Sequence, residues 1–251
     1  MRYFLEISFK GTPFHGWQEQ PNAVSVQSSI EKALSTLLRC PTKIVGAGRT
    51  DAGVHAKQMF AHFDSEKNID KTDLKHKLNS FLSKDIAIHN IYNVKNDAHA
   101  RFDAIWRSYE YHIHQEKNPF LNELSWFYSK KLDIDEMNKA VKSLLFYKDF
   151  KSFSKTKTDV KTYICTIDEA YWEIDDRQLI FHITANRFLR NMVRSIVGTL
   201  INVGLHKISY DDFIKIIEAK DRTKAGFSVP AQGLYLSKII YPKNIYNYGI
   251  D

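Results

Sequence analysis

The sequence predicts an α+β protein built from two similar domains. Each half of the chain contains, in order, a strand, a helix, two strands, helical sequence and a last strand, which is the order of a split βαβ unit. Hydrophobic residues make up 43% of the 251 residues, enough to bury the cores of two domains. We therefore expect two RRM-like, or ferredoxin-like, βαββαβ domains, residues 1–104 and 105–251, with antiparallel sheets side by side and a cleft between them.

Hydrophobic spacing defines the elements of the first half. Apolar residues alternate from Tyr3 to Phe9 and predict a strand, while a helical stripe from Val26 to Leu38 follows Ser25, a good N-cap. The remaining elements are a helix near 74–82 that Thr72 would cap, and strands at 43–47, 58–63 and 86–94.

The second half repeats this order. Its elements are a strand at 105–114, a helical stripe at 137–145, strands at 163–174 and 179–184, helices at 188–203 and 211–218, and a last strand at 233–240. The basic stretch 151–158 is expected to be a loop, either gripping RNA or simply solvated.

Composition indicates the kind of partner. Lys plus Arg exceed Asp plus Glu by 36 − 29 = 7, and such a basic balance suits nucleic acid. The two cysteines are far apart and form no metal-spaced cluster, so we expect neither a disulfide framework nor a cysteine zinc site. With no leader and no apolar run of ~20 residues, we expect a cytoplasmic protein that does not enter membranes.

The run from Gly48 to Ala56, GRTDAGVHA, is the most informative stretch. In an extended segment Arg49 and Asp51 point to the same side, and a nearby cation favours the charged form of a carboxylate. Asp51 would then act as an ionised nucleophile or base. A simple polar turn explains these letters equally well.

The predicted strand that opens the second half places Arg107, Tyr109 and Tyr111 on one face. On a cleft wall, a tyrosine ring there would stack on a base. The alternative, which the residues alone favour, is that both tyrosines pack the core of the sheet.

A basic helix start is predicted further along the chain. Arg187, Arg190 and Arg194 would lie at the beginning of an apolar helix, where the helix dipole disfavours cations. Arg190 and Arg194, four residues apart, would share a face and bind a phosphate or the Asp51 carboxylate. A solvated face paired with scattered acids is the alternative.

The loop after the first strand contains Phe14, His15 and Trp17, and its residues allow either RNA contact or self-packing. Near the end of the chain, Ala225-Gly226-Phe227 and the segment from Pro230 to Leu236 are expected to form a close-packed turn that leads to an apolar wall.

Taken together, these segments resemble the tRNA pseudouridine synthase I family. GRTDAGVHA resembles its catalytic segment, and further matching motifs occur in the family's order over nearly the whole chain. They are FHGWQEQP, SVQSSIEKAL, HARFDA with RSYEY, NRFLRNMVRSIVGTL, DRTKAG and PAQGLYL. Lys10, where an aspartate is common, and Ser228-Val229, in place of Thr-Ala, depart from the pattern outside the residues carried over.

The resemblance implies an isomerase that converts uridine to pseudouridine in the anticodon stem-loop of tRNA, at positions 38, 39 and 40, without cofactor or metal. It implies Asp51 as the catalytic residue, Tyr109 as the stacking residue, a paired role for Arg49 and Arg194, and Leu234 as part of the pocket wall. It also implies a homodimer in which one tRNA touches both subunits.

Two other functions compete with this interpretation. A non-catalytic RNA-binding protein would explain the charge, the aromatic residues and the fold, but would not need Arg49 and Asp51 so arranged. A metal-dependent phosphohydrolase would need further clustered ligands, which the sequence does not supply.

Overall fold

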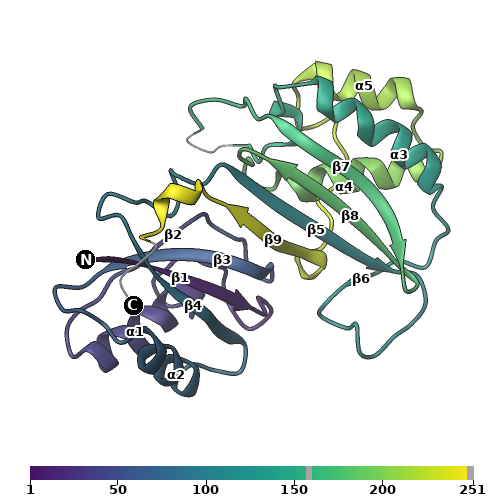
Figure 1. Cartoon of the computed structure of the whole chain (residues 1–251). Helices are drawn as coiled ribbons and strands as arrows, with labels where there is room; N and C mark the ends of the chain where they lie inside the picture. Colours follow the sequence, from purple (N-terminus) through teal and green to yellow (C-terminus); the bar gives the residue numbers. More distant parts are fainter. Residues whose placement is uncertain (157–159, 248–251) are drawn as a thin grey trace. The chain divides into compact units, whose positions relative to one another are not determined.

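The α+β class is confirmed by a computed structural model, which describes residues 1–156 and 160–247. The chain forms two compact units, shown in Figure 1. The first unit contains Met1–Ile105 and the chain from Tyr235 onward, and the second contains Trp106–Leu234. The chain passes from the first unit to the second after Ile105, one residue from the predicted boundary. That the chain returns to the first unit at Tyr235 was not predicted. That the two halves repeat one fold stays a prediction.

The sheet of the first unit is centred on β1 (Arg2–Phe9) and β3 (His55–Asp64). β1 pairs antiparallel with β3 and with β4 (Ile86–Val94). The short β2 (Val45–Gly46), predicted over five residues, also pairs with β3.

The last strand, β9 (Leu234–Ile240), pairs with β3 in parallel, with His55 opposite Tyr235 and Ala56 opposite Leu236. The expectation of a purely antiparallel sheet was therefore wrong. A parallel pair needs a long connection, and periodicity within one half of a chain cannot reveal a partner in the other half.

Two helices lie on the same side of the β4–β1–β3 sheet in Figure 1. α1 (Val26–Leu38) begins after Ser25, whose hydroxyl accepts from the Ser28 amide at 3.1 Å, so the predicted N-cap is confirmed. α2 (Lys71–Phe81) is capped by Asp70 instead of Thr72, because the Asp70 carboxylate accepts from the Thr72 and Asp73 amides. The helices bury Ile30, Leu34, Leu74 and Leu78.

The second unit has an antiparallel sheet in the order β5 (Trp106–His114), β8 (Gln178–Ala185), β7 (Ile167–Asp175). A two-residue strand, β6 (Trp126–Phe127), pairs in parallel with β5. The strand predicted over 163–174 begins at Ile167, since Ile164 forms only an isolated bridge with Asp149.

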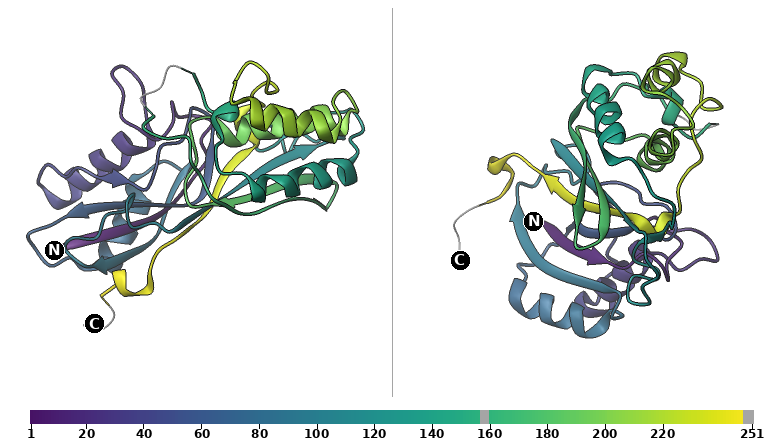
Figure 2. Two further views of the ribbon diagram at one scale, coloured as in Figure 1. Left: turned by 90° about the horizontal axis from the view of Figure 1, so that it is seen from above. Right: turned by 90° about the vertical axis from the view of Figure 1, so that its right-hand side faces the viewer.

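Three helices lie together on one face of this sheet (Figures 1 and 2). They are α3 (Ile134–Lys142), α4 (Met192–Gly204) and α5 (Tyr210–Ala219). The predicted start of α4 at Phe188 was wrong. Asn191 precedes the helix with φ of 67°, a left-handed conformation that a regular helix does not contain. Arg187 and Arg190 therefore lie outside α4, and of the three arginines Arg194 alone lies where the helix dipole disfavours a cation.

Part of the predicted basic loop belongs to the core. Lys151–Phe153 forms a 3₁₀ turn in which Ser152 and Phe153 are buried, and the Ser152 hydroxyl donates to Ile216 O of α5 at 2.7 Å. Lys157 and Thr158 of this stretch lie outside the described residues.

Both cysteines are free, as expected. Within the described ranges the longest helices have 13 residues, and none is long and apolar enough to cross a membrane.

Candidate active site

Asp51 lies in the first unit, in a turn between β2 and β3, and is half-buried. The Val54 amide donates to Asp51 O at 3.2 Å, and Gly53 takes φ of 78°, which glycine adopts without strain. The turn expected from these letters therefore exists, and it presents the aspartate that the resemblance singles out. Arg49 is exposed, and its pairing with Asp51 stays a prediction.

Thr50, the residue before Asp51, is buried. Its carbonyl oxygen accepts from the Trp17 amide at 3.2 Å, while within the described part of the chain its hydroxyl has no hydrogen-bond partner. The backbone leading into Asp51 is thus bonded to the loop that follows β1.

His55 fixes the other side of the turn. It is 1% exposed, and its Nδ1 accepts from the Gly11 amide at 3.0 Å, so the ring carries its proton on Nε2 when neutral. The ring stacks on Tyr235 with centroids 4.6 Å apart, at the point where β3 and β9 pair. Residues on both sides of Asp51 are therefore held by packed elements.

In the second unit, Tyr109 and Tyr111, which the sequence could not assign to the core or to a cleft wall, have different environments. Tyr111 is fully buried, and its hydroxyl donates to Pro230 O at 2.8 Å, so it is a core residue. Tyr109 is half-buried and meets the Phe188 ring edge-on, with centroids 5.0 Å apart. Burial strongly raises the pKa of Tyr111, and the nearby charge of Arg194 opposes this rise.

Arg194 lies in the first turn of α4 and is half-buried. Its Nε donates to Val229 O at 2.6 Å, and the Val229 amide donates back to Arg194 O at 3.3 Å. Arg190 is exposed and precedes the helix, so the helical i, i+4 relationship predicted for these two arginines was wrong. Its carbonyl accepts from the Lys155 amide at 3.0 Å.

The segment 222–229, which we call the strap, holds Val229 beside α4. Arg222 donates to Ala225 O, Gly226 O and Ser228 Oγ at 3.3, 3.0 and 3.1 Å. The Gly226 amide donates to Thr199 Oγ1 at 2.9 Å, and a Cβ on Gly226 would lie 2.7 Å from Gly198 O. The close packing predicted around Gly226 is confirmed, while the turn itself lies just before it, at residues 222–224.

Leu234 begins β9 and is 7% exposed. The preceding Gly233 lies against Tyr111, since a Cβ there would be 2.7 Å from its Cζ. The predicted site residues thus fall into two groups: Arg49 and Asp51 belong to the first unit, and Tyr109, Arg190, Arg194 and Leu234 belong to the second.

Comparison with known proteins gives matches over almost the whole sequence. A family model described as tRNA pseudouridine synthase matches residues 7–103 and 140–242. The tRNA pseudouridine synthase A of Porphyromonas gingivalis is 50% identical over 249 residues, covering 98% of this chain and 99% of that protein. The corresponding proteins of Parabacteroides distasonis and Exiguobacterium sibiricum are 52% and 35% identical, covering 98% and 97% of this chain and 98% of each relative.

The chain belongs to the tRNA pseudouridine synthase A family. It is therefore an intramolecular isomerase, as the resemblance of its motifs implied. The family match includes the Asp51 turn, Arg190, Arg194 and Leu234, while Tyr109 lies outside its two matched ranges.

Sequence reasoning assigned no supporting role to the residues that hold this site. Val229 bonds Arg194 through its carbonyl and its amide, and Arg222 bonds the strap that carries Val229. The Trp17 amide donates to Thr50 O. Arg222 lies in the motif DRTKAG and Trp17 in FHGWQEQP, and Val229 follows the first of these motifs. The contacts of Val229 with Arg194 and of Trp17 with Thr50 join segments far apart in the chain.

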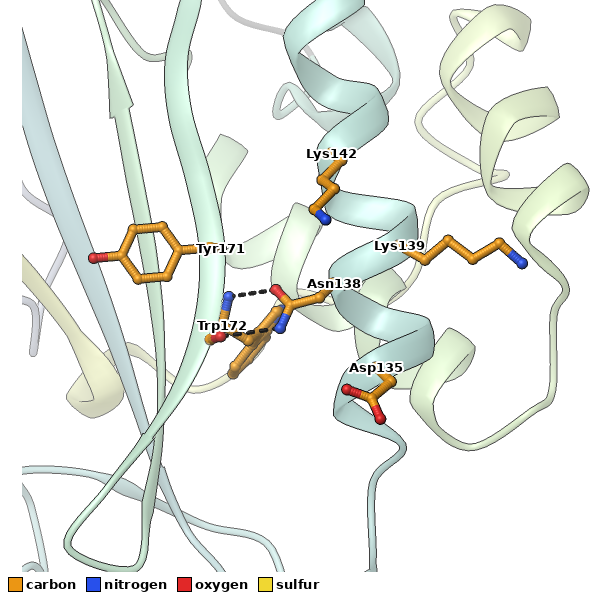
Figure 3. A pocket seen from close by; sticks show the side chains of 6 residues that line it. All are labelled: Asp135, Asn138, Lys139, Lys142, Tyr171 and Trp172. Carbon is orange, nitrogen blue, oxygen red and sulfur yellow. Dashed lines mark hydrogen bonds between the residues drawn. The ribbon is translucent and has the colours of Figure 1, made fainter.

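A separate hollow of about 500 Å³ lies between α3 and β7. Figure 3 shows the side chains that line it, from Asp135, Asn138, Lys139, Lys142, Tyr171 and Trp172. The Asn138 side chain donates to Trp172 O at 3.0 Å and accepts from the Trp172 amide at 2.8 Å. The Asn138 side chain therefore joins α3 to the sheet. None of the predicted site residues of this synthase lines it.

Proposed function

We propose that this chain converts uridine to pseudouridine at tRNA positions 38, 39 and 40 of the anticodon stem-loop, with Asp51 as its catalytic carboxylate. The observation that carries the proposal is the half-buried Asp51, held in a fixed turn in a chain that matches tRNA pseudouridine synthases over nearly its full length. The basic composition, with a formal charge of +7, suits a tRNA substrate.

The target uridine must leave its stack before its glycosidic bond can react. Extrusion costs a few kcal/mol, which stacking and phosphate contacts offset. Tyr109 supplies the stacking ring, and its edge contact with Phe188 sets the orientation of that ring. The exposed cation Arg190 is suited to phosphate contacts.

The bond between uracil N1 and ribose C1′ then breaks with the help of Asp51, either by attack on the sugar or base or by proton abstraction. The uracil turns while it remains confined, and its C5 bonds to C1′. The proton on C5 leaves and N1 gains one, so substrate and product have the same atoms and no cofactor is consumed. Leu234, which is buried, would exclude water, and Arg49 and Arg194 would together stabilise the Asp51 carboxylate.

Turnover of a uridine-labelled tRNA transcript in the presence of chelator tests this function. The wild type should form pseudouridine, and Asp51→Asn should lose turnover by at least about 10³-fold while its Kd for tRNA stays within about threefold. The matched control is Asp97→Asn, an exposed aspartate of the same unit, which should behave as wild type. Appreciable turnover by purified Asp51→Asn would reject the role.

The same assay separates the competing functions. Binding without product would favour a non-catalytic RNA-binding protein, and metal-dependent release of phosphate would favour a phosphohydrolase.

We further propose that the protein is a cytoplasmic homodimer with one tRNA touching both subunits. Sedimentation at micromolar concentration, with and without tRNA, should give a dimer. A monomer under both conditions would contradict this assembly.

A further inference from the structure

The loop from Gly11 to Trp17, between β1 and α1, packs against the backbone around Asp51. At one end, a Cβ on Gly11 would lie 2.5 Å from Val54 C, and the Gly11 amide donates to His55 Nδ1 at 3.0 Å. The loop thus meets the chain just after the aspartate.

Gly16, at the other end of the loop, meets the peptide that joins Thr50 to Asp51. A Cβ on Gly16 would lie 2.5 Å from Thr50 O and 3.2 Å from Asp51 C. Its φ of 87° is also one that L side chains rarely adopt. Two independent features therefore require glycine at this position.

Trp17 fastens the segment that leads into Asp51. Its amide donates to Thr50 O at 3.2 Å, and its indole is 2% exposed. The ring covers Gly46, where a Cβ would lie 2.5 Å from Trp17 Cε2. One residue thus contacts both ends of the 46–50 segment.

The loop is itself supported by the start of α1. The Val26 amide donates to Gly16 O at 3.3 Å, and the Gln27 amide donates to Trp17 O at 3.0 Å. These bonds use amides of the first helical turn that have no partner inside the helix. The loop that contacts the Thr50–Asp51 peptide is therefore bonded to the first turn of a 13-residue helix.

We propose that Gly16 and Trp17 are positioning residues for Asp51, which set the place of its carboxylate by holding the Thr50–Asp51 peptide against α1. The inference rests on the proposed catalytic role of Asp51. A displacement of about 1 Å at a reacting group is enough to lower a rate about 100-fold, even when substrate binding is unchanged. The loop therefore acts on the rate of reaction and not on the affinity for tRNA.

The test is Gly16→Ala, measured by single-turnover kinetics on a tRNA transcript and by tRNA binding. We expect a rate about 100-fold below wild type and a Kd within about threefold. Circular dichroism should show a folded protein. Gly204→Ala is the matched control, because its Cβ would lie 2.9 Å from Met137 Cγ in the second unit and crowd the core without touching this loop. Its rate should stay within threefold of wild type.

A second pair of variants covers the case in which Gly16→Ala does not fold. Trp17→Ala should lower the single-turnover rate at least tenfold with Kd unchanged, and Trp17→Phe should restore most of it by covering Gly46 again. A folded Gly16→Ala with a wild-type rate overturns the inference, as does a Trp17→Ala variant with a wild-type rate.

Asp51→Asn, assayed in parallel, distinguishes failure of the proposed function from failure of the positioning role. If Asp51→Asn is active, the proposed function fails. If Asp51→Asn is inactive while Gly16→Ala and Trp17→Ala retain full rates, only the positioning role fails.

Discussion

Arg194 Nε donates a 2.6 Å hydrogen bond to Val229 O, and the Val229 amide donates back to Arg194 O at 3.3 Å. This reciprocal pair joins the first turn of α4 to the strap. It fixes the guanidinium plane of the one arginine that lies within the helix start.

Arg194→Lys should lower kcat for pseudouridine formation at least tenfold with the fold intact. A lysine keeps the charge but has no planar fork, so it cannot both donate to Val229 O and keep its remaining donors in the same directions. Turnover assays with thermal unfolding as the control measure this. A Lys variant with more than half of the wild-type kcat would contradict the role.

Arg222→Ala should destabilise the protein by about 1–3 kcal/mol, because three strap acceptors lose a charged donor in a part-buried site. Urea unfolding measures the change. Arg177→Ala is the control: Arg177 forms an exposed ion pair with Glu116, and the loss of this pair should cost less than about 0.5 kcal/mol. Equal losses in the two variants would show that the strap contacts add nothing.

Acid should destabilise the fold through His62. Burial, with help from the charges of Arg2 and His99, lowers the pKa of His62 to about 4. The unfolded chain therefore binds more protons than the fold between pH of about 6.5 and about 4, so stability rises with pH across this window and is lost as pH falls through it.

His62→Asn should reduce this slope, because asparagine does not titrate. Its side-chain oxygen can still accept from the Ala100 amide, as His62 Nδ1 does at 3.1 Å, so the fold should tolerate the change. Urea midpoints between pH 4 and 7 measure the slope. A slope identical to wild type in His62→Asn would exclude this histidine as its source.

Two neighbouring glycines should respond in opposite ways to alanine. Gly46→Ala places a Cβ 2.5 Å from the Trp17 ring and should destabilise by about 1–3 kcal/mol through overpacking. Gly48→Ala meets nothing within 4 Å and should raise stability by about 0.4–1 kcal/mol, because it restricts the unfolded chain. Thermal unfolding of both variants measures these changes in stability. Equal changes in Tm would contradict the packing of Trp17 on Gly46.

Periodicity was sufficient for β1, β4, β5, β8, α1 and α5, where the apolar pattern is long and its flanking residues cap or end the element. It was insufficient at α4, since the left-handed Asn191 excludes residues 188–191 from the helix despite their helix-like spacing. It also failed for residues 151–154, where Ser152 and Phe153 are buried within a polar, basic stretch.

For the site, the resemblance of the sequence motifs to the family singled out Asp51 and Tyr109, and the roles of both residues stay predictions. The pairing of β9 with β3, the burial of Tyr111, the bond from Arg194 to Val229 and the packing of Gly16 on the Thr50–Asp51 peptide were decided only by the tertiary structure. The physical reason is that each depends on backbone atoms of a distant segment, and backbone atoms are the same for every residue type.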